Sequence, residues 1–181
     1  ETIEEYSEFL RKKTYMLANP FEKENNFLKT AVLKTPKSPK QIVTPANGEK
    51  MIAEIKTLRS LDCRLLQSKN YEVFFAEADK IPNILHEIGR LREITFREVG
   101  EGTNESIDLD KYDQYYHHLF LWDDDAQKIA GAYRMGLGAE IYPKYGIEGF
   151  YLNSLFRFEP ELHDMMHQSI EMGRALIIKE Y

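Results

Sequence analysis

Residues 117–138, HHLFLWDDDAQKIAGAYRMGLG, have the pattern of two β-strands joined by an acidic turn. The apolar runs HHLFLW and KIAGAYRMGLG flank the polar stretch DDDAQ, which is typical of an antiparallel hairpin. The acid cluster of Asp123, Asp124 and Asp125 is expected at the solvated tip. Gly136 and Gly138 are interpreted as turn glycines, because no G-x-G-x-x-G phosphate motif follows them and no helix N-terminus is evident.

The segments before this hairpin predict a strand, a helix and a loop, in that order. YEVFFAEA at residues 71–78 is rich in β-forming residues. A long helix is expected to begin at Ile81-Pro82, because the apolar residues that follow recur on one face. These residues are Ile84, Leu85, Ile88, Leu91 and Phe96. Residues 99–114, VGEGTNESIDLDKYDQ, are polar and acidic and predict a loop with a short helical turn.

Three further segments follow the hairpin. EGFYLNSLFRF at residues 148–158 predicts a strand or an extended turn, HDMMHQS at 163–169 a short helical piece, and ALIIKEY at 175–181 a final apolar strand. The expected fold class is α/β (α+β), with a mixed, mostly antiparallel sheet flanked by helices.

The first 50 residues are expected to form a helical appendage. Thr2 and Glu5 make a capping-box pattern ahead of an amphipathic helix over residues 3–18. Residues 34–50, KTPKSPKQIVTPANGEK, read as a linker. From Met51 a second helix is expected to continue to the SKN that precedes Tyr71. We therefore predict an appendage over residues 1–50 and a main unit over residues 51–181.

Composition narrows the function classes. The chain of 181 residues is 43% hydrophobic and carries a net charge of -6, so a duplex nucleic-acid reader is not expected. The single cysteine, Cys63, excludes an intrachain disulfide and fits a reducing, cytoplasmic compartment. No apolar run approaches the roughly 18 residues that span a bilayer. Nine basic against seven acidic residues in the first 50 leave only weak support for peripheral contact with the membrane.

Four spaced motifs resemble one family. They are LREITFREVG (91–100), DLDKYD (108–113), KIAGAYR (128–134) and SIEMGRALI (169–177). Together with the order of elements, they resemble the branch of the GNAT superfamily that contains acyl-homoserine lactone synthases and the N-acyltransferases of ornithine and glycine lipid synthesis. The match is closest to bacterial proteins labelled hemolysin-like. It covers about 110 residues, the N-terminal part of such a domain, and residues 1–20 resemble the tail of a glycerolipid acyltransferase domain.

The resemblance implies an acceptor pocket and a set of residues that form it. The matching positions are Arg92, Phe96, Asp110, Asp113, Arg134, Glu171 and Arg174. Glu171 is the candidate base, because an amine must lose a proton before or during attack on a thioester. Arg134 and Arg92 offer planar forks for a substrate carboxylate, and Asp110 or Asp113 offers a partner for an ammonium group. The oxyanion is expected to meet backbone N–H groups.

The resemblance also implies an acyl thioester as donor and no tightly bound cofactor. The loop by which coenzyme A-using members hold the pyrophosphate is absent, and its usual position lies at or beyond Tyr181. Truncation and a preference for acyl carrier protein explain the absence equally well. The expected function is transfer of a fatty acyl group from acyl carrier protein or coenzyme A to a small amine or amino acid in membrane lipid synthesis. The isolated chain is expected to be inactive.

The residues assigned to the pocket also have simpler structural interpretations. Arg92 on a helix face is more often a solvated charge, aspartates in loops usually cap turns, and Glu171 with Arg174 has the spacing of a structural ion pair. A non-catalytic module that dimerises through its exposed last strand is the alternative function. A zinc hydrolase is a weaker one, based on His163 and His167. His117 and His118 alternate on a strand and cannot share an ion. The aromatic run is expected to form core and pocket wall; it comprises Tyr112, Tyr115, Tyr116, Phe120 and Trp122.

Overall fold

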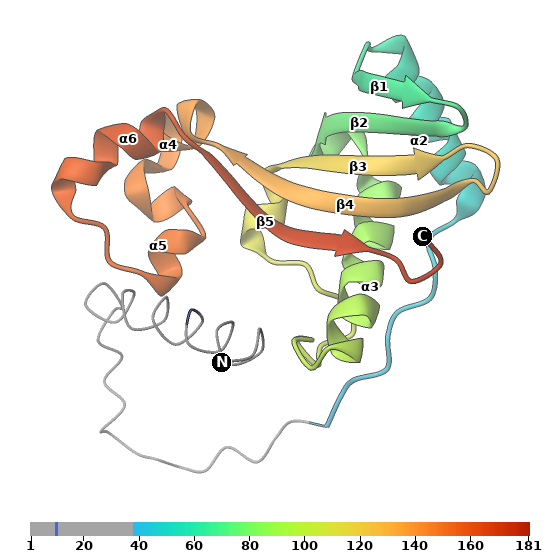
Figure 1. Cartoon of the computed structure of the whole chain (residues 1–181), viewed down its shortest axis with the longest axis horizontal. Coiled ribbons are helices and arrows are strands. Elements are labelled where there is room, and N and C mark those ends of the chain that lie inside the picture. The colour runs from blue at the N-terminus through green and yellow to red at the C-terminus, as the bar shows by residue number, and fades with distance from the viewer. Residues whose placement is uncertain (1–9, 11–37) are drawn as a thin grey trace.

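The computed structural model describes Leu10 and residues 38–181. The predicted helix over residues 3–18 lies outside the described residues, apart from Leu10, which is helical. The described chain contains a five-stranded antiparallel sheet with the strand order β1-β2-β3-β4-β5 (Figure 1). The strands are β1 (Arg64–Ser68), β2 (Tyr71–Glu77), β3 (His117–Asp123), β4 (Lys128–Leu137) and β5 (Ile170–Ile177).

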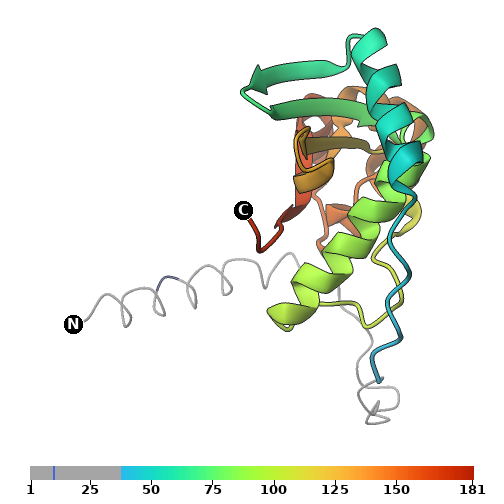
Figure 2. The same ribbon diagram turned by 90° about the vertical axis from the view of Figure 1, so that its right-hand side faces the viewer.

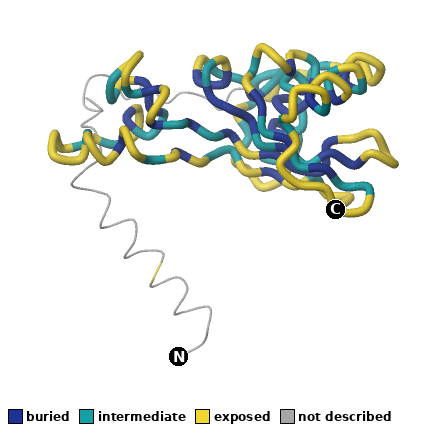
Figure 3. Tube along the Cα trace, turned by 90° about the horizontal axis from the view of Figure 1, so that it is seen from above, coloured by how far each residue is buried: buried dark blue, intermediate teal, exposed yellow. Residues whose placement is uncertain are grey.

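Two long helices cover one face of the sheet. Helices α2 (Gly48–Ser60) and α3 (Pro82–Glu98) lie on the same side of the strands (Figure 2). The main core is built from residues of these two helices and of β2 to β5, and Figure 3 marks the buried parts of the trace in dark blue. Its buried members are Met51, Ile55, Leu58, Phe74, Ala76, Ile81, Ile84, Ile88, Phe120, Trp122, Ile129, Ala132 and Leu176. The expected α+β architecture is therefore confirmed.

A group of short helices lies beyond one end of β4 and β5. They are α4 (Gly138–Tyr145), α5 (Leu152–Leu155) and α6 (His163–His167), with 3-10 turns at Gly146–Gly149 and Pro160–Leu162 (Figure 1). They enclose a second core of Tyr112, Tyr116, Ile141, Phe150 and Met166. No described helix is both long and apolar enough to cross a membrane.

Several predicted elements are confirmed. The hairpin of β3 and β4, the strand β2 and the helix α3 occur where the sequence patterns place them. The polar segment 99–114 is a loop that ends in the predicted short turn, a 3-10 helix over Lys111–Gln114. Of the linker predicted over residues 34–50, residues 38–47 have no regular structure, whereas residues 48–50 belong to α2. It is nevertheless attached to the body, because Ala46 N–H donates to the Glu87 carboxylate at 2.9 Å.

The second predicted helix was wrong in its extent. It begins at Gly48, where the Asn47 side chain caps it, and ends at Ser60 instead of near residue 69. The next residues form β1, which pairs with β2 across the tight turn between Ser68 and Tyr71. All five β1 residues are exposed, so β1 has no buried face whose period could reveal a strand.

Two glycines and one segment after the hairpin were also misread. Gly136 lies within β4 and Gly138 begins α4, so neither occupies a turn. A Cβ on Gly138 would lie 2.0 Å from the Met166 carbonyl oxygen, so close packing requires the glycine. Residues 148–158 contain the helical turn α5 instead of a strand. The last strand begins at Ile170, five residues before the predicted start.

The acid cluster between β3 and β4 is only partly solvated. Asp123 is buried and accepts hydrogen bonds from the Asn70 side chain, two backbone N–H groups and the Tyr181 hydroxyl. Asp124 accepts from Trp122 and Arg59. These aspartates therefore fix the geometry of the turn, which corrects the expectation of a freely solvated tip.

Candidate active site

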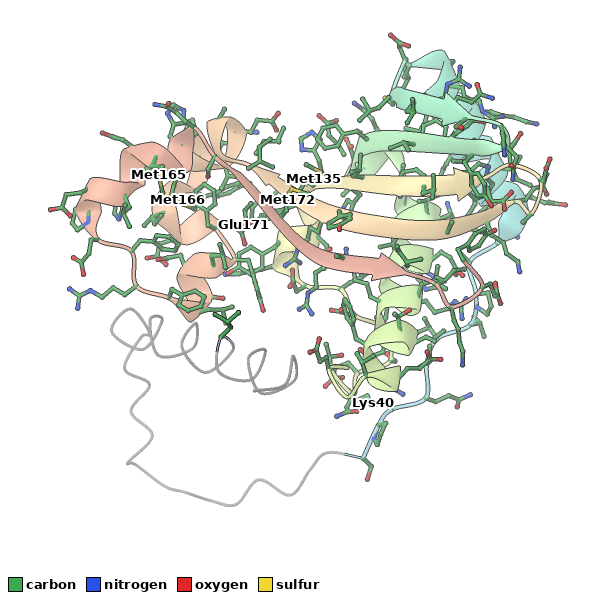
Figure 4. All side chains as sticks on the ribbon, viewed as in Figure 1. Lys40, Met135, Met165, Met166, Glu171 and Met172 are labelled. Atoms are coloured by element: carbon green, nitrogen blue, oxygen red, sulfur yellow. The ribbon has the colours of Figure 1, made fainter. Side chains whose placement is uncertain are left out.

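A pocket of about 360 Å³ lies at the edge of β5 that no described strand pairs with. It is bounded by the C-terminal end of α3, the segment around Tyr151, and β5, where Glu171 and Met172 can be followed in Figure 4. Its lining consists of Phe96, Glu101, Tyr116, Arg134, Tyr151, Leu152, Glu171, Met172, Gly173, Arg174 and Ala175. Four of the seven residues implied by the family resemblance are among them.

A bulge in β5 brings two of these residues to the same side. Glu171 and Arg174 are three apart, so a regular strand would point them to opposite faces. The pairing register shifts opposite Ala132 to Arg134, and Arg174 has a left-handed backbone with φ of 52°. Such a conformation is costly for a residue other than glycine and is found mostly where the surrounding structure enforces it. Both side chains consequently line the pocket.

Asp110 and Asp113 do not line the pocket, but they hold Arg134, which does. They cap the 3-10 helix Lys111–Gln114 reciprocally: the Asp110 side chain accepts from the Asp113 N–H, and the Asp113 side chain accepts from the Asp110 N–H. The capping oxygens also hold Arg134, whose Nη1 donates to Asp110 Oδ1 at 2.7 Å and to Asp113 Oδ2 at 3.2 Å. The other oxygen of Asp113, Oδ1, accepts from Arg92 Nη1 at 2.7 Å. The turn-capping role is thus confirmed, and it operates together with ion pairing.

These contacts settle the charge state of Asp113. Burial opposes its ionisation, but Arg92 and Arg134 outweigh that effect and hold the pKa of Asp113 below its ordinary value. Burial likewise opposes the charge on Arg134, and Asp113 and Asp110 outweigh it, so the pKa of Arg134 is raised. Arg92, which has no exposed side-chain surface, lies behind Asp113 and does not line the pocket. The reading of Arg92 as a solvated charge is therefore wrong.

Tyrosine rings surround the guanidinium of Arg134. Its central carbon lies 5.6 Å from the ring centre of Tyr112, 5.3 Å from that of Tyr116 and 5.2 Å from that of Tyr151. These distances fall within the range of cation–π attraction. The rings therefore hold the positive charge at the pocket wall, which agrees with the predicted role of the aromatic run. Tyr151 had escaped the sequence analysis, since it follows a 3-10 turn without periodicity.

Glu171 is buried and has three hydrogen-bond donors. The Tyr116 hydroxyl donates to Oε2 at 2.7 Å, the Tyr151 N–H donates to Oε2 at 3.1 Å, and the Leu152 N–H donates to Oε1 at 3.1 Å. A carboxylate offers about four acceptor positions, so one position on Oε1 is left. Burial and the Glu171 carboxylate raise the pKa of Tyr116, which keeps its hydroxyl protonated as a donor.

Arg174 forms its ion pairs with Asp108 and Asp110, and not with Glu171. Its Nη1 lies 3.3 Å from Asp108 Oδ2 and its Nη2 lies 3.9 Å from Asp110 Oδ2. The simple ion-pair reading of Glu171 with Arg174 is therefore wrong. Asp108 is buried, and burial raises the pKa of its carboxyl against the opposing effects of Arg174 and Arg92. Asp108 lies in the loop whose aspartates were expected, on the simpler interpretation, only to cap turns, and it pairs with Arg174 instead.

The histidines do not build a metal site in the described part of the chain, where no three His, Cys, Asp or Glu side chains converge. His163 and His167 occupy α6, but the zinc alternative finds no third ligand among the described residues. His117 stacks on Phe75, whereas His118 is buried and its Nε2 lies 3.0 Å from the Asp113 carbonyl oxygen. Burial lowers the pKa of His118 to about 4.

A larger cavity of about 550 Å³ lies between α3 and the segment that follows β5. None of the residues implied by the resemblance lines it. In the described part of the chain, the charged residues that line this cavity form no ion pair with the aspartates and arginines described above. The smaller pocket is therefore the candidate active site, because it combines a half-buried arginine, a buried carboxylate with a spare acceptor position, and a strand edge with which no described strand pairs.

The fold and the pocket define an α+β domain of GNAT architecture, with an antiparallel sheet, helices on one face and a polar pocket at an edge strand. The family model described as "Acetyltransferase (GNAT) domain" matches residues 91–181, and the chain belongs to this family.

Two curated proteins are similar to the chain. One, named glycine N(alpha)-acyltransferase, from Bacteroides thetaiotaomicron, is 34% identical over 146 residues, which cover 78% of this chain and 43% of that protein. The other carries the same name, comes from Phocaeicola vulgatus and is 33% identical over 146 residues, covering 78% of this chain and 44% of that protein. The chain thus spans less than half the length of these relatives. No solved structure is significantly similar to it.

Proposed function

We propose that the protein to which this chain belongs transfers an acyl group from a thioester to the amino group of glycine or a similar small acceptor. The observation that carries the proposal is Glu171, a buried carboxylate at the pocket wall with one free acceptor position on Oε1. The family and the names of the two similar proteins support the same reaction. The proposed donor is acyl carrier protein or coenzyme A, loaded with a fatty acyl group.

The reaction has a definite balance of bonds and protons. The amine nitrogen attacks the thioester carbonyl carbon, an N–C bond forms, and the C–S bond breaks. The proton that the nitrogen loses as the amide forms balances the proton that the leaving thiolate takes up to become the thiol. The ammonium form of the acceptor must first lose a proton. We assign this step to Glu171 Oε1, directly or through one water, because Oε2 is already occupied by Tyr116 and Tyr151. Backbone N–H groups along the free edge of β5 are the proposed donors to the oxyanion.

The six remaining residues implied by the resemblance form the acceptor side in this proposal. Arg134 and Arg174 supply positive charge at the pocket wall. Asp110 and Asp113 hold Arg134, and Arg92 neutralises Asp113 from behind. Both aspartates are occupied by these partners, which favours Glu171 over them as the group that meets the ammonium. Phe96 contributes an apolar part of the wall.

The test is a thiol-release assay with acyl carrier protein and coenzyme A donors, using the longest native protein that contains this chain. Glycine should stimulate release, and Glu171→Gln should lower kcat by about 100-fold or more, since general base catalysis contributes about that much. Glu98→Gln is the matched control, because Glu98 is exposed on α3 and lies outside the pocket. Equal activity in Glu171→Gln would remove Glu171 from the chemistry.

The proposal also includes the metabolic role, the cellular location and the protein partner of the reaction. An N-acyl amino acid made from a fatty acyl donor is amphiphilic, so we place the reaction in membrane lipid synthesis, in the cytoplasm and at the periphery of the membrane. Acyl carrier protein is the proposed protein partner. Lipid extracts of cells with and without the gene should differ in N-acyl amino acids, and identical extracts would contradict this assignment.

One observation favours a second candidate, a homodimer formed through β5. No described strand pairs with its outer edge, and Ile170, Met172 and Ile177 on this strand are more than half exposed. Such edges pair readily with another chain. Sedimentation velocity at increasing concentration would detect the dimer, and Ile177→Lys should shift the protein toward monomer. A monomer at all concentrations would contradict this candidate.

A further inference from the structure

Arg174 differs from the other two arginines of the cluster in its unused hydrogen-bonding capacity. Arg92 and Arg134 each have a nitrogen within 2.7 Å of a carboxylate oxygen. Arg174 makes only the longer contacts of 3.3 and 3.9 Å, and its side chain makes no hydrogen bond to any described residue. A guanidinium carries five N–H donors. Arg174 therefore has the donors that the pocket leaves available to a ligand.

The surroundings hold Arg174 at the pocket despite this loose contact. Its backbone is in the left-handed region, its side chain is 22% exposed, and its guanidinium lies 5.7 Å from the ring centre of Tyr151. Gly173, just before it, has open space where a Cβ would lie. Backbone strain of this kind at a pocket is typical of a side chain that is aimed at a ligand.

The chemistry of the ligand follows from the neighbouring charges. A planar guanidinium matches a planar group with two oxygens, which a carboxylate provides. A phosphate of the donor would also carry oxygens, but Asp108, Asp110 and Glu171 are all nearby and would repel a multiply charged anion more strongly than a single carboxylate. The site thus favours a carboxylate with one negative charge.

We propose that Arg174 binds the carboxylate of the acceptor, so that the pocket selects α-amino acids over simple amines. This inference rests on the proposed function and specifies its substrate class. The same strand then handles both charges of a zwitterion: Oε1 of Glu171 meets the ammonium group, and Arg174 meets the carboxylate. Asp108 is a positioning residue that keeps the Arg174 fork beside the pocket through its Oδ2, which has no hydrogen-bond donor among the described residues.

The test compares glycine with glycinamide, which has the same size and amino group but no carboxylate. The native protein should prefer glycine by at least about 10-fold in kcat/KM, and Arg174→Gln should remove that preference by raising the KM for glycine about 10- to 100-fold. The kcat/KM for glycinamide should stay within about threefold. Arg174→Lys, which keeps the charge without the fork, should show an intermediate preference.

Arg90→Gln is the matched control, because Arg90 pairs with Glu87 on α3 and lies outside the pocket. It should leave the preference for glycine unchanged. Near-ultraviolet circular dichroism of each variant establishes that it is folded. If Arg174→Gln does not fold, Arg174→Lys decides the outcome, since native-like discrimination by the lysine variant would overturn the role of the fork.

Two results would overturn the inference. They are equal use of glycine and glycinamide by the native protein, and equal losses for both acceptors in Arg174→Gln. Absence of any acyl transfer would instead count against the proposed function. In that case saturation-transfer NMR decides: glycine binding that exceeds glycinamide binding and is lost in Arg174→Gln supports the inference, and no such difference refutes it.

Discussion

Two charged clusters lie at opposite ends of the sheet and differ in how completely their groups are paired. The hairpin cluster consists of Arg59, Arg64, Glu72 and Asp124, and every buried side-chain nitrogen and oxygen in it has a hydrogen-bond partner. The pocket cluster consists of Arg92, Asp108, Asp110, Asp113, Arg134 and Arg174. In it, buried atoms of Arg92, Asp108 and Arg174 have no hydrogen-bond partner among the described residues.

This difference separates a structural role from a functional one. Unpaired polar atoms in a buried site cost free energy, so a cluster that serves stability alone is expected to be satisfied. The arginines of the hairpin cluster are also about a third exposed and can turn to water. Arg92 and Asp113 cannot, because both are almost fully enclosed. The pocket cluster should consequently be both less tolerant of change and more sensitive to pH.

The largest expected effect is that of Asp113→Ala. This change leaves Arg92 and part of Arg134 as buried charges without a counter-ion, and breaking such a pair costs about 3 to 5 kcal/mol. Urea unfolding followed by circular dichroism at pH 7 measures the free energy of unfolding. Asp125→Ala at the exposed hairpin turn is the control and should change it by less than about 0.5 kcal/mol. A loss below about 1 kcal/mol in Asp113→Ala would mean that the cluster reorganises freely.

The next effect is the loss of stability in acid caused by His118. Its pKa of about 4 in the folded state is below the ordinary value of about 6.5. As the pH falls through 6.5, the unfolded state binds the proton first, so stability is lost between about pH 6.5 and 4, by roughly 3 kcal/mol in total.

The titration of two neighbouring carboxyls also changes the free energy of unfolding as the pH falls. The raised pKa of Asp108 gives the opposite sign, since the folded state binds its proton more readily, and the lowered pKa of Asp113 acts only below its ordinary range. The variant His118→Gln retains both carboxyls, so their contributions cancel when its pH dependence is compared with that of the native protein. Unfolding measured from pH 7.5 to 4 should be flatter in the variant, and parallel curves would contradict the assignment to His118.

The smallest effect is expected at the hairpin cluster. Arg59→Ala should lower the free energy of unfolding by about 1 kcal/mol or less, because Arg64 still pairs with Glu72 and the lost ion pairs are partly exposed. The same urea unfolding measurement applies. A loss above about 2 kcal/mol would show that the two clusters do not differ in the way that their pairing suggests.

Much of the fold was predictable where burial imposes a period on the sequence. Helix α3 and strand β2 each bury one face, so their apolar residues recur with a period, and β3 and β4 are apolar runs that flank a polar turn. Strand β1 escaped prediction because none of its residues is buried, and α4 escaped because Gly138 was interpreted as a turn residue when its real constraint is contact with the Met166 carbonyl. Contacts of this kind join residues far apart in the chain and leave no local pattern.

The sequence alone determined the fold class and the order of the elements from β2 to β4, and the resemblance of its motifs to a family supplied a set of candidate residues for the pocket. Those properties are local, because they depend on side-chain period, turn residues and motif spacing. Only the tertiary structure decided what each charge does. The bulge in β5 brought Glu171 and Arg174 to the same pocket, burial placed Arg92 behind Asp113, and the Tyr116 hydroxyl met Glu171 across 55 positions of sequence. Hydrogen bonding and burial depend on three-dimensional neighbours, and a single strand or helix does not specify them.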